Sequence, residues 1–392
     1  MEPENQDMLA EAPQDGTAAA PPAHEAAALD PFALPPHMRE PNPLRWIFMG
    51  PQGLRAGWSV AIFIAVLLLL GRALSFVMHK IRPSSSGNDF TPGGALISEF
   101  LAFLLILAAA WIVALIERRS VMDYNLSGPR RPYFFFSGFL TGFAALSALV
   151  GALMWGGWLH FGPVALSGPK IFEYAAMWGL AFLFVGFVEE GSMRCFLLST
   201  LTRGLNFWWA LGLIGAICLD LAIRAKGNGV WGVYAIALMG LGPCLWLHLR
   251  RSPGAGFWQA AWVTSTFFGF GHTSNGGENW IGIFAAAAIG FVFCVSVRVT
   301  GSAWWAIGCH AAWDWAETYF YGTADSGFVA KGHFLSTTTG GNPLWSGGTD
   351  GPEGSLLVIG VILLLLVVLL VLYGGKKRAV PISVPALQHA LE

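Results

Sequence analysis

Ten apolar segments constrain this chain more than any other feature, because each is near the length of a membrane-crossing helix. A helix crosses the hydrocarbon layer in about 20 mostly apolar residues. Lipid offers no hydrogen bonds, so each segment must pair its own backbone polar groups, as an α-helix does. The expected spans are 57–79, 95–116, 133–158, 173–201, 207–223, 228–248, 255–274, 280–298, 303–320 and 355–373. We therefore predict an all-α fold, a polytopic transmembrane helical bundle of about ten spans, with a range of about 8–10.

The composition favours the same class of protein. Hydrophobic residues make up 55% of the 392 residues and charged residues only 11%, whereas soluble domains carry about 25% charged residues. The net charge of −1 provides no basic surface for nucleic acid, so no nucleic-acid partner is expected. The five cysteines form no CxxC pair, which argues against a disulfide framework or a thiolate zinc site.

The chain divides into regions of different character. The first 44 residues are rich in Ala and Pro and carry eight acidic residues against one basic residue, a composition that predicts disorder. The Gly/Ser/Thr-rich stretch after the ninth span is expected to be a flexible external connection. The predicted regions are 1–44 (disordered tail), 45–170 (N-terminal spans), 171–320 (transmembrane core), 321–354 (loop) and 355–392 (last span and short tail).

The basic residues between the spans predict the orientation in the membrane. Cytoplasmic loops carry an excess of Lys and Arg. With the N-terminus in the cytoplasm, fourteen of the 22 basic residues fall on the cytoplasmic side and six on the other, while Arg72 and Arg194 lie inside spans. We expect an integral, multi-pass membrane protein with both termini cytoplasmic, in the plasma or inner membrane if the source is bacterial.

The fourth span contains three ionisable side chains, Glu189, Glu190 and Arg194. A charge at mid-bilayer costs at least about 2.5–3.5 kcal/mol on insertion scales, and such residues usually face the bundle interior and serve function. Glu190 and Arg194 are four residues apart, so they share a helix face and can pair. Glu189 is rotated by about 100° from Glu190 and remains available to accept a proton.

Two further spans contribute histidines. The seventh span ends on His272, with Phe268 one turn before it and expected to pack beside it. The ninth contains His310 and Asp314, four residues apart on one face, where the aspartate can orient the imidazole or, when protonated, donate to a developing oxyanion. Glu317 lies close to the end of the same span, where we expect water to reach it.

Together these residues resemble the three motifs of the CPBP intramembrane proteases, which include the type II CAAX prenyl endopeptidases and bacterial abortive-infection-like proteins. The resemblance covers about residues 173–320, and 299–314 is especially close to the third motif and its lead-in. The matching motifs are Glu189-Glu190-xxx-Arg194, Phe268-xxx-His272 and His310-xxx-Asp314.

The resemblance implies an endopeptidase that cuts a membrane-embedded or lipidated peptide or protein without a cofactor. By resemblance, Glu189 is the general base that activates water, and His272 helps to position that water. His310 and Asp314 stabilise the tetrahedral oxyanion. Glu190 and Arg194 hold the geometry of the site.

The sequence departs from the family pattern at several positions. Met193 and Cys195 flank the arginine where Phe and Gly are usual, and Asp314 stands where Asn often ends the third motif. The 83-residue step from Glu189 to His272 is long, and two extra spans near 207–248 would fill it. At 1.5 Å per residue, Glu189 lies about 18 Å, His310 about 10 Å and His272 about 26 Å from the cytoplasmic ends of their spans. A shared site therefore predicts that the seventh span is broken, tilted or starts later.

Three alternative interpretations remain open at this stage. Two histidines and a glutamate can bind zinc with an open position for water, which would make the enzyme a metalloprotease. Glu, His and Asp within spans also build the proton relays of transporters, although the repeated halves typical of transporters are not evident. A non-catalytic scaffold with a retained family fold is the third alternative.

Overall fold

All ten apolar segments form helices in the computed structural model, which describes residues 47–50, 52–81, 91–225, 229–252 and 254–375. The acidic tail predicted to be disordered, residues 1–44, lies outside the described residues. The ten helices are α2 (Ala56–Ile81), α3 (Pro92–Ile116), α4 (Arg131–Trp155), α5 (Lys170–Glu190), α7 (Phe207–Arg224), α8 (Gly229–Leu249), α9 (Ala255–His272), α10 (Trp280–Thr300), α11 (Trp304–Asp314) and α13 (Leu357–Tyr373).

Within the described residues, seven helices are long and apolar enough to cross a membrane. They are α2, α3, α4, the continuous helical stretch Lys170–Gly204 that begins with α5, α7, α8 and α10. Helix α13 is apolar but shorter, and α9 and α11 carry the polar motif residues. The predicted helical transmembrane bundle is therefore confirmed, with three of the expected spans shorter or more polar than a free-standing membrane helix.

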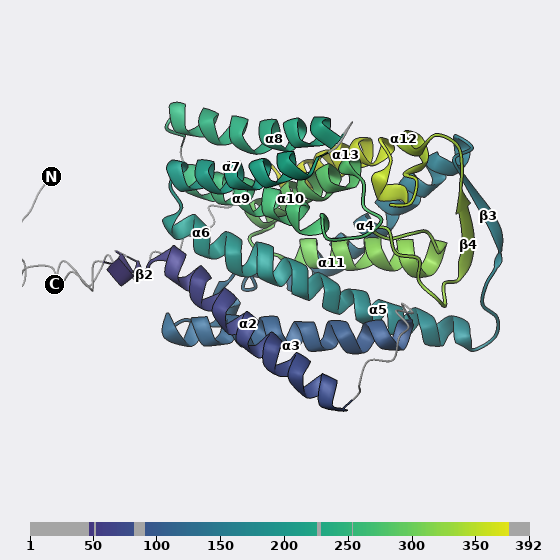
Figure 1. The fold of residues 1–392 in the computed structure, drawn as a ribbon, viewed down its shortest axis with the longest axis horizontal. Coiled ribbons are helices and arrows are strands. Elements are labelled where there is room, and N and C mark those ends of the chain that lie inside the picture. The colour runs from purple at the N-terminus through teal and green to yellow at the C-terminus, as the bar shows by residue number, and fades with distance from the viewer. Residues whose placement is uncertain (1–46, 51, 82–90, 226–228, 253, 376–392) are drawn as a thin grey trace, which may run out of the picture. The chain divides into compact units, whose positions relative to one another are not determined.

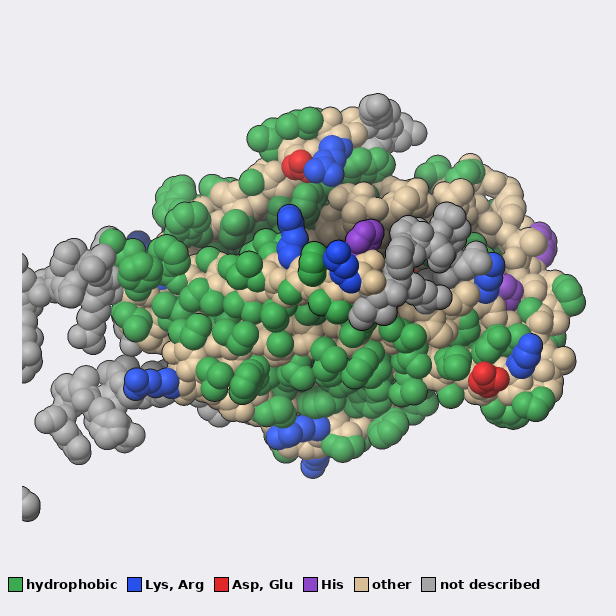
Figure 2. Space-filling model, turned by 60° about the horizontal axis from the view of Figure 1, so that its bottom comes forward, with side chains coloured by type: hydrophobic (Ala, Val, Ile, Leu, Met, Phe, Trp, Pro, Cys, Tyr) green, Lys and Arg blue, Asp and Glu red, His purple; other side chains and the backbone are tan. Residues whose placement is uncertain are grey.

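The outer surface of the bundle is apolar. Leu69, Trp155 and Leu238 are 70%, 92% and 75% exposed, which would be unfavourable in water but suits contact with lipid. Figure 2 shows one face of the molecule, on which hydrophobic side chains predominate and charged side chains are few and scattered. The protein is an integral membrane protein on these grounds.

Short elements connect the helices. The strands β1 (Met49–Gly50) and β2 (Gly53–Leu54) pair antiparallel, as do β3 (Leu159–Val164) and β4 (Leu335–Thr339). The remaining short elements are η2 (Val121–Asp123), the π-helical η3 (Gly191–Leu197), α6 (Leu198–Gly204), the π-helical η4 (Trp315–Tyr321), α12 (Pro343–Ser346) and η5 (Pro352–Gly354).

The stretch 321–354, expected from its composition to be a flexible connection, contains regular elements and buried residues. It contains β4, α12 and η5, and it buries Thr323, Ser346 and Asp350. Glycine-rich composition was misleading because several glycines adopt the positive φ angles that tight turns require; Gly351, for example, has φ +103°. In Figure 1 this segment runs beside the ends of α4, α5 and α11.

Helix α11 is held at the centre of the bundle by close backbone approach. A Cβ atom on Gly138 or Gly142 of α4 would meet backbone carbonyls of α11, and a Cβ atom on Gly308 of α11 would meet the carbonyl of Phe135. Small residues spaced four apart allow such close packing in membranes, where lipid gives no hydrophobic drive for association. This packing fixes the position of the helix that carries His310.

Candidate active site

The two helices that carry carboxylates change their winding at the motif. Helix α5 ends on Glu190 and continues as the π-helical η3, while α11 ends on Asp314 and continues as the π-helical η4. Single π-turns inside α-helices are frequent at functional sites, because the wider turn redirects neighbouring side chains. In both helices the change follows directly after a residue predicted to belong to the site.

Glu190 and Arg194 form the predicted ion pair in a fully buried setting. Their Oε1 and Nη1 atoms are 3.2 Å apart, and both side chains are 0% exposed. The guanidinium also lies 4.3 Å from the ring centroid of Phe268, a cation–π contact that offsets part of its desolvation. Gly290 makes room for this group, because a Cβ atom there would come within 2.5 Å of Nη2.

His310 is surrounded by three carboxylates. Its Nδ1 lies 2.8 Å from Oε1 of Glu190, and its Nε2 lies 3.4 Å from Asp314 and 3.6 Å from Glu189. The sequence predicted the contact with Asp314 but not the bond to Glu190. The carboxylate of Glu190 accepts this hydrogen bond, so Nδ1 carries a proton and donates the hydrogen bond. The bond fixes the orientation of the ring.

His272 is oriented by its own helix. Its Nδ1 lies 2.9 Å from the backbone carbonyl oxygen of Phe268, so this nitrogen donates and Nε2 is left as an acceptor. The ring of Phe268 packs against the imidazole at 4.8 Å between centroids, as predicted. The same ring meets His310 at 6.1 Å and supports Arg194 on another side, so Phe268 connects the second motif to the other two.

One cavity of about 360 Å³ collects these groups. Glu189, His272, His310 and Asp314 all line it. Glu190 and Arg194 lie behind His310 and are fully buried. The side chain of Glu189 is 36% exposed, so solvent reaches it. The structure therefore brings all six predicted site residues together.

Helix α9 is not broken and does not start later, so two of the three alternatives expected from depth are wrong, whereas a tilt of this helix stays a prediction. It runs without interruption over Ala255–His272 and begins where the apolar segment begins. The fourth span continues through η3 and α6 to Gly204, beyond its expected end at residue 201. At 1.5 Å per residue this extension adds about 4.5 Å to the depth of Glu189 and brings it closer to that of His272.

Two further features of the site were not foreseen. Phe293 of α10 stacks on His310 at 5.8 Å and lies 5.4 Å from the Arg194 guanidinium; nothing in the sequence distinguishes it from the other aromatic residues of the spans. Glu317 is 0% exposed, so the expectation that water reaches it was wrong. The π-helical turn and the segment 321–354 enclose it.

The two helices expected between the first and second motifs are present as α7 and α8. They pack with α9 and α10 in one apolar cluster that includes Ile214, Ile236, Val263 and Ile283. The long step from Glu189 to His272 is therefore filled by a helical hairpin.

Comparison with known families gives one match. Residues 243–316 match the family described as Type II CAAX prenyl endopeptidase Rce1-like. The matched segment runs from the end of α8 into η4 and includes His272, His310 and Asp314, whereas Glu189, Glu190 and Arg194 lie outside it. No curated protein and no solved structure matches the chain. The match confirms the family resemblance, and this is a family of proteases.

Proposed function

We propose that this chain, in which residues 243–316 belong to the Rce1-like family of type II CAAX prenyl endopeptidases, is an intramembrane endopeptidase that uses Glu189 to activate water. The observation that carries the proposal is the shared cavity. A solvent-accessible glutamate, two histidines with fixed ring orientations and an aspartate face one space of about 360 Å³. Peptide hydrolysis needs a base, a second group that handles protons, and donors for the developing charge.

Glu189 is suited to the role of general base. Glu190 is committed to Arg194 and His310, whereas Glu189 points into the cavity. Its carboxylate accepts a proton from a water molecule, and the resulting hydroxide attacks the scissile carbonyl carbon. His272 accepts through Nε2 and aligns that water. The proton held by Glu189 then passes to the leaving amine, so the protons balance over the reaction.

His310 is suited to stabilise the oxyanion. The bond from Nδ1 to Glu190 fixes the ring, and Nε2 faces the cavity between Glu189 and Asp314. In this proposal both ring nitrogens of His310 carry a proton, so that Nδ1–H stays bonded to Glu190 while Nε2–H donates to the tetrahedral intermediate. A protonated Asp314 adds a second donor. Removing one such donor lowers kcat by about 10²–10³-fold in other hydrolases.

The proposed substrate is a membrane-associated peptide or protein, of the CAAX type by family. The cavity walls carry apolar side chains from α5, α10 and α13, including Phe182, Ile289 and Ile362, which suit a lipidated or transmembrane segment. We further propose that both termini are cytoplasmic, as the distribution of Lys and Arg predicts.

Cleavage assays in proteoliposomes test the proposal directly. The substrates are a prenylated CAAX peptide and an unmodified transmembrane peptide, each incubated with wild type, Glu189→Gln and the control Glu173→Gln. Glu173 is an exposed carboxylate in the first turn of the same helix. We expect Glu189→Gln to lower kcat by about 10²–10⁴-fold while the control retains wild-type activity. Wild-type rates in Glu189→Gln would rule out the proposed base.

A further inference from the structure

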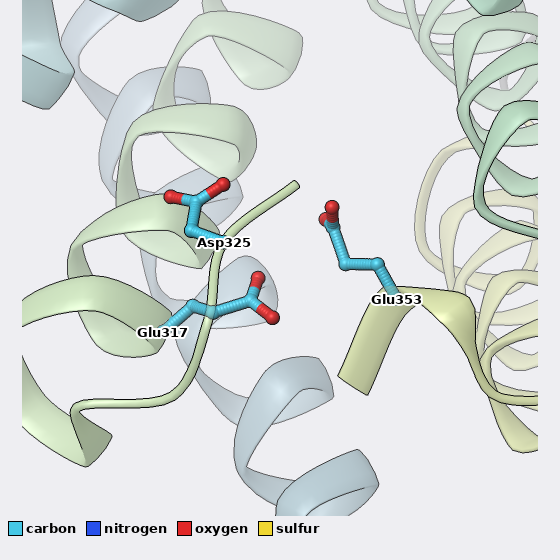
Figure 3. A group of neighbouring side chains, drawn as sticks. All are labelled: Glu317, Asp325 and Glu353. Atoms are coloured by element: carbon cyan, nitrogen blue, oxygen red, sulfur yellow. The ribbon is translucent and has the colours of Figure 1, made fainter. Parts of the chain in front are cut away.

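Three carboxylates outside the proposed catalytic set converge from three separate segments. Glu317 lies in η4, Asp325 in the loop that follows, and Glu353 in η5. One oxygen from each side chain lies within 4.8 Å of the others, and Figure 3 shows the three carboxylates grouped around a common space. Asp325 and Glu353 also line the cavity that contains Glu189 and His272.

The hydrogen bonds that these carboxylates accept come from uncharged donors. The indole N–H of Trp313 is shared between Glu317, at 3.0 Å, and Glu353, at 2.7 Å. The hydroxyls of Thr318 and Ser326 donate to Asp325 and Glu353, respectively. These donors hold the carboxylates in place but bring no positive charge to offset their mutual repulsion.

A second observation points to a missing ligand. Glu317 is 0% exposed, and its Oε1 has no hydrogen-bond partner among the residues that the structure describes. A buried polar atom without a partner carries the full desolvation penalty of that group. Because Glu317 belongs to the group of oxygens within 4.8 Å, a cation in their midst would satisfy this atom and screen the three charges together.

The donor set defines the class of cation. All candidate ligand atoms are carboxylate or hydroxyl oxygens, which hard divalent cations prefer. Zinc prefers histidine and cysteine ligands, and neither occurs in this group. We propose that Glu317, Asp325 and Glu353 bind a hard divalent cation, Ca²⁺ or Mg²⁺, at a structural site beside the catalytic cavity. This inference goes beyond the proposed function and does not depend on it.

Such a cation would link the segment 321–354 to the helix that carries His310 and Asp314. Glu353 lies in η5, the short element before α13, and Asp325 lies in the loop between η4 and β4, while Glu317 lies one turn beyond Asp314. A single ion therefore links the helix of the third motif to both ends of the segment 321–354. It would stabilise the enclosed form of the cavity.

The test is cation-dependent thermal unfolding of the purified full-length protein in a neutral detergent after treatment with EDTA and removal of the chelator. CaCl₂ and MgCl₂ are added separately to wild type, Asp325→Asn, Glu353→Gln and the control Glu173→Gln. We expect millimolar Ca²⁺ or Mg²⁺ to raise the unfolding midpoint of wild type and control by a few degrees. The two loop variants should lose most of this shift, and Glu317→Gln should lose it as well if that variant folds.

The variant Glu189→Gln separates this site from catalysis. It should respond to Ca²⁺ or Mg²⁺ as wild type does, whether or not the chain proves to be a protease. The proposal is overturned if the cations leave wild type unchanged, if the loop variants respond as wild type does, or if Glu189→Gln abolishes the response. The last result would place the ion at the catalytic residues instead.

Discussion

Two groups of acidic side chains lie at the cavity, and they differ in what offsets their negative charge. In the first, Glu190 lies 3.2 Å from Arg194 and 2.8 Å from His310. In the second, Glu317 and Glu353 share the neutral indole N–H of Trp313. The first group carries its own positive charge, whereas the contacts of the second are uncharged.

This difference indicates what each group can do. A carboxylate with an internal cationic partner needs no ion from solution and is held in one orientation, which suits a fixed part of a catalytic site. Closely spaced carboxylates with neutral partners must bind protons or a cation. Two acidic groups of similar composition are therefore expected to differ in how they respond to mutation and to chelators.

The largest effect is expected when the internal positive charge is removed. Arg194→Met leaves Glu190 buried without its cation, which should destabilise the fold by about 3–5 kcal/mol. Thermal unfolding of wild type and of Arg194→Met measures this loss. The double variant Arg194→Met/Glu190→Gln should regain part of the stability, because the unpaired charge is then gone. If Arg194→Met alone is as stable as wild type, Arg194 is not the counter-charge of Glu190 that the geometry indicates.

The next largest effect is expected from chelators, which should affect the second group but not the first. EDTA, which binds both Ca²⁺ and Mg²⁺, should lower the unfolding midpoint by removing the proposed cation of the second group. The loss is equivalent to about 2.7 kcal/mol if the ion was present at about 100 times its Kd. The zinc chelator 1,10-phenanthroline should leave peptide cleavage unchanged, because the proposed mechanism activates water with Glu189 rather than with a metal. Loss of cleavage with phenanthroline and its recovery with Zn²⁺ would favour the metalloprotease alternative.

The sequence was informative wherever a residue type was rare for its surroundings. Glu189, Arg194 and His310 stand out because charge in an apolar span is costly, and helical spacing gave the pairs Glu190–Arg194 and His310–Asp314. The apolar runs likewise marked all ten helices. The match between the spacing rule and the structure is close because both pairs lie within single helices.

Helical spacing does not predict contacts between segments that are distant in the sequence. Glu190 and His310 are 120 residues apart, and only tertiary packing brings α5 and α11 together. A Cβ atom on Gly186 of α5 would come within 3.1 Å of the carbonyl oxygen of Ile307 in α11. Asp325 and Glu353 lie in a Gly/Ser/Thr-rich stretch, where an acidic residue has no unusual neighbours to mark it. Their proximity became visible only in the fold, which places these two half-buried carboxylates beside the buried Glu317.

A third acidic site, Glu117 at the end of α3, is also buried but has two cationic partners. Its oxygens lie 2.9 Å from both Arg203 and Arg119, and Ser59 donates to it at 2.5 Å. Burial alone would raise the pKa of Glu117, but the hydrogen bonds from Ser59 and Arg203 and the two positive charges outweigh it and lower the pKa below its ordinary value of 4.5.

The stability that Glu117 contributes should therefore depend on pH in one direction. Because its pKa is lower in the folded state, the contribution is fully present above the unfolded-state pKa and is lost as the pH falls through the folded-state pKa. Glu117→Gln should be less stable than wild type by about 1.5 kcal/mol at pH 7, with the gap closing below about pH 4. Denaturation of both proteins across this range, with Glu173→Gln as control, measures it; a gap that is constant with pH would contradict the assignment.

The smallest effect is expected for the single change Asp314→Asn, at a residue one turn from Glu317. If Asp314 acts as a protonated donor to the oxyanion, Asp314→Asn supplies an N–H in its place and should keep cleavage within about tenfold of wild type. Asp314→Leu, which has no donor, should lose about 10²–10³-fold in kcat. If instead the asparagine and leucine variants are equally inactive, the negative charge is what matters, and Asp314 belongs with Glu190 among the carboxylates that hold His310.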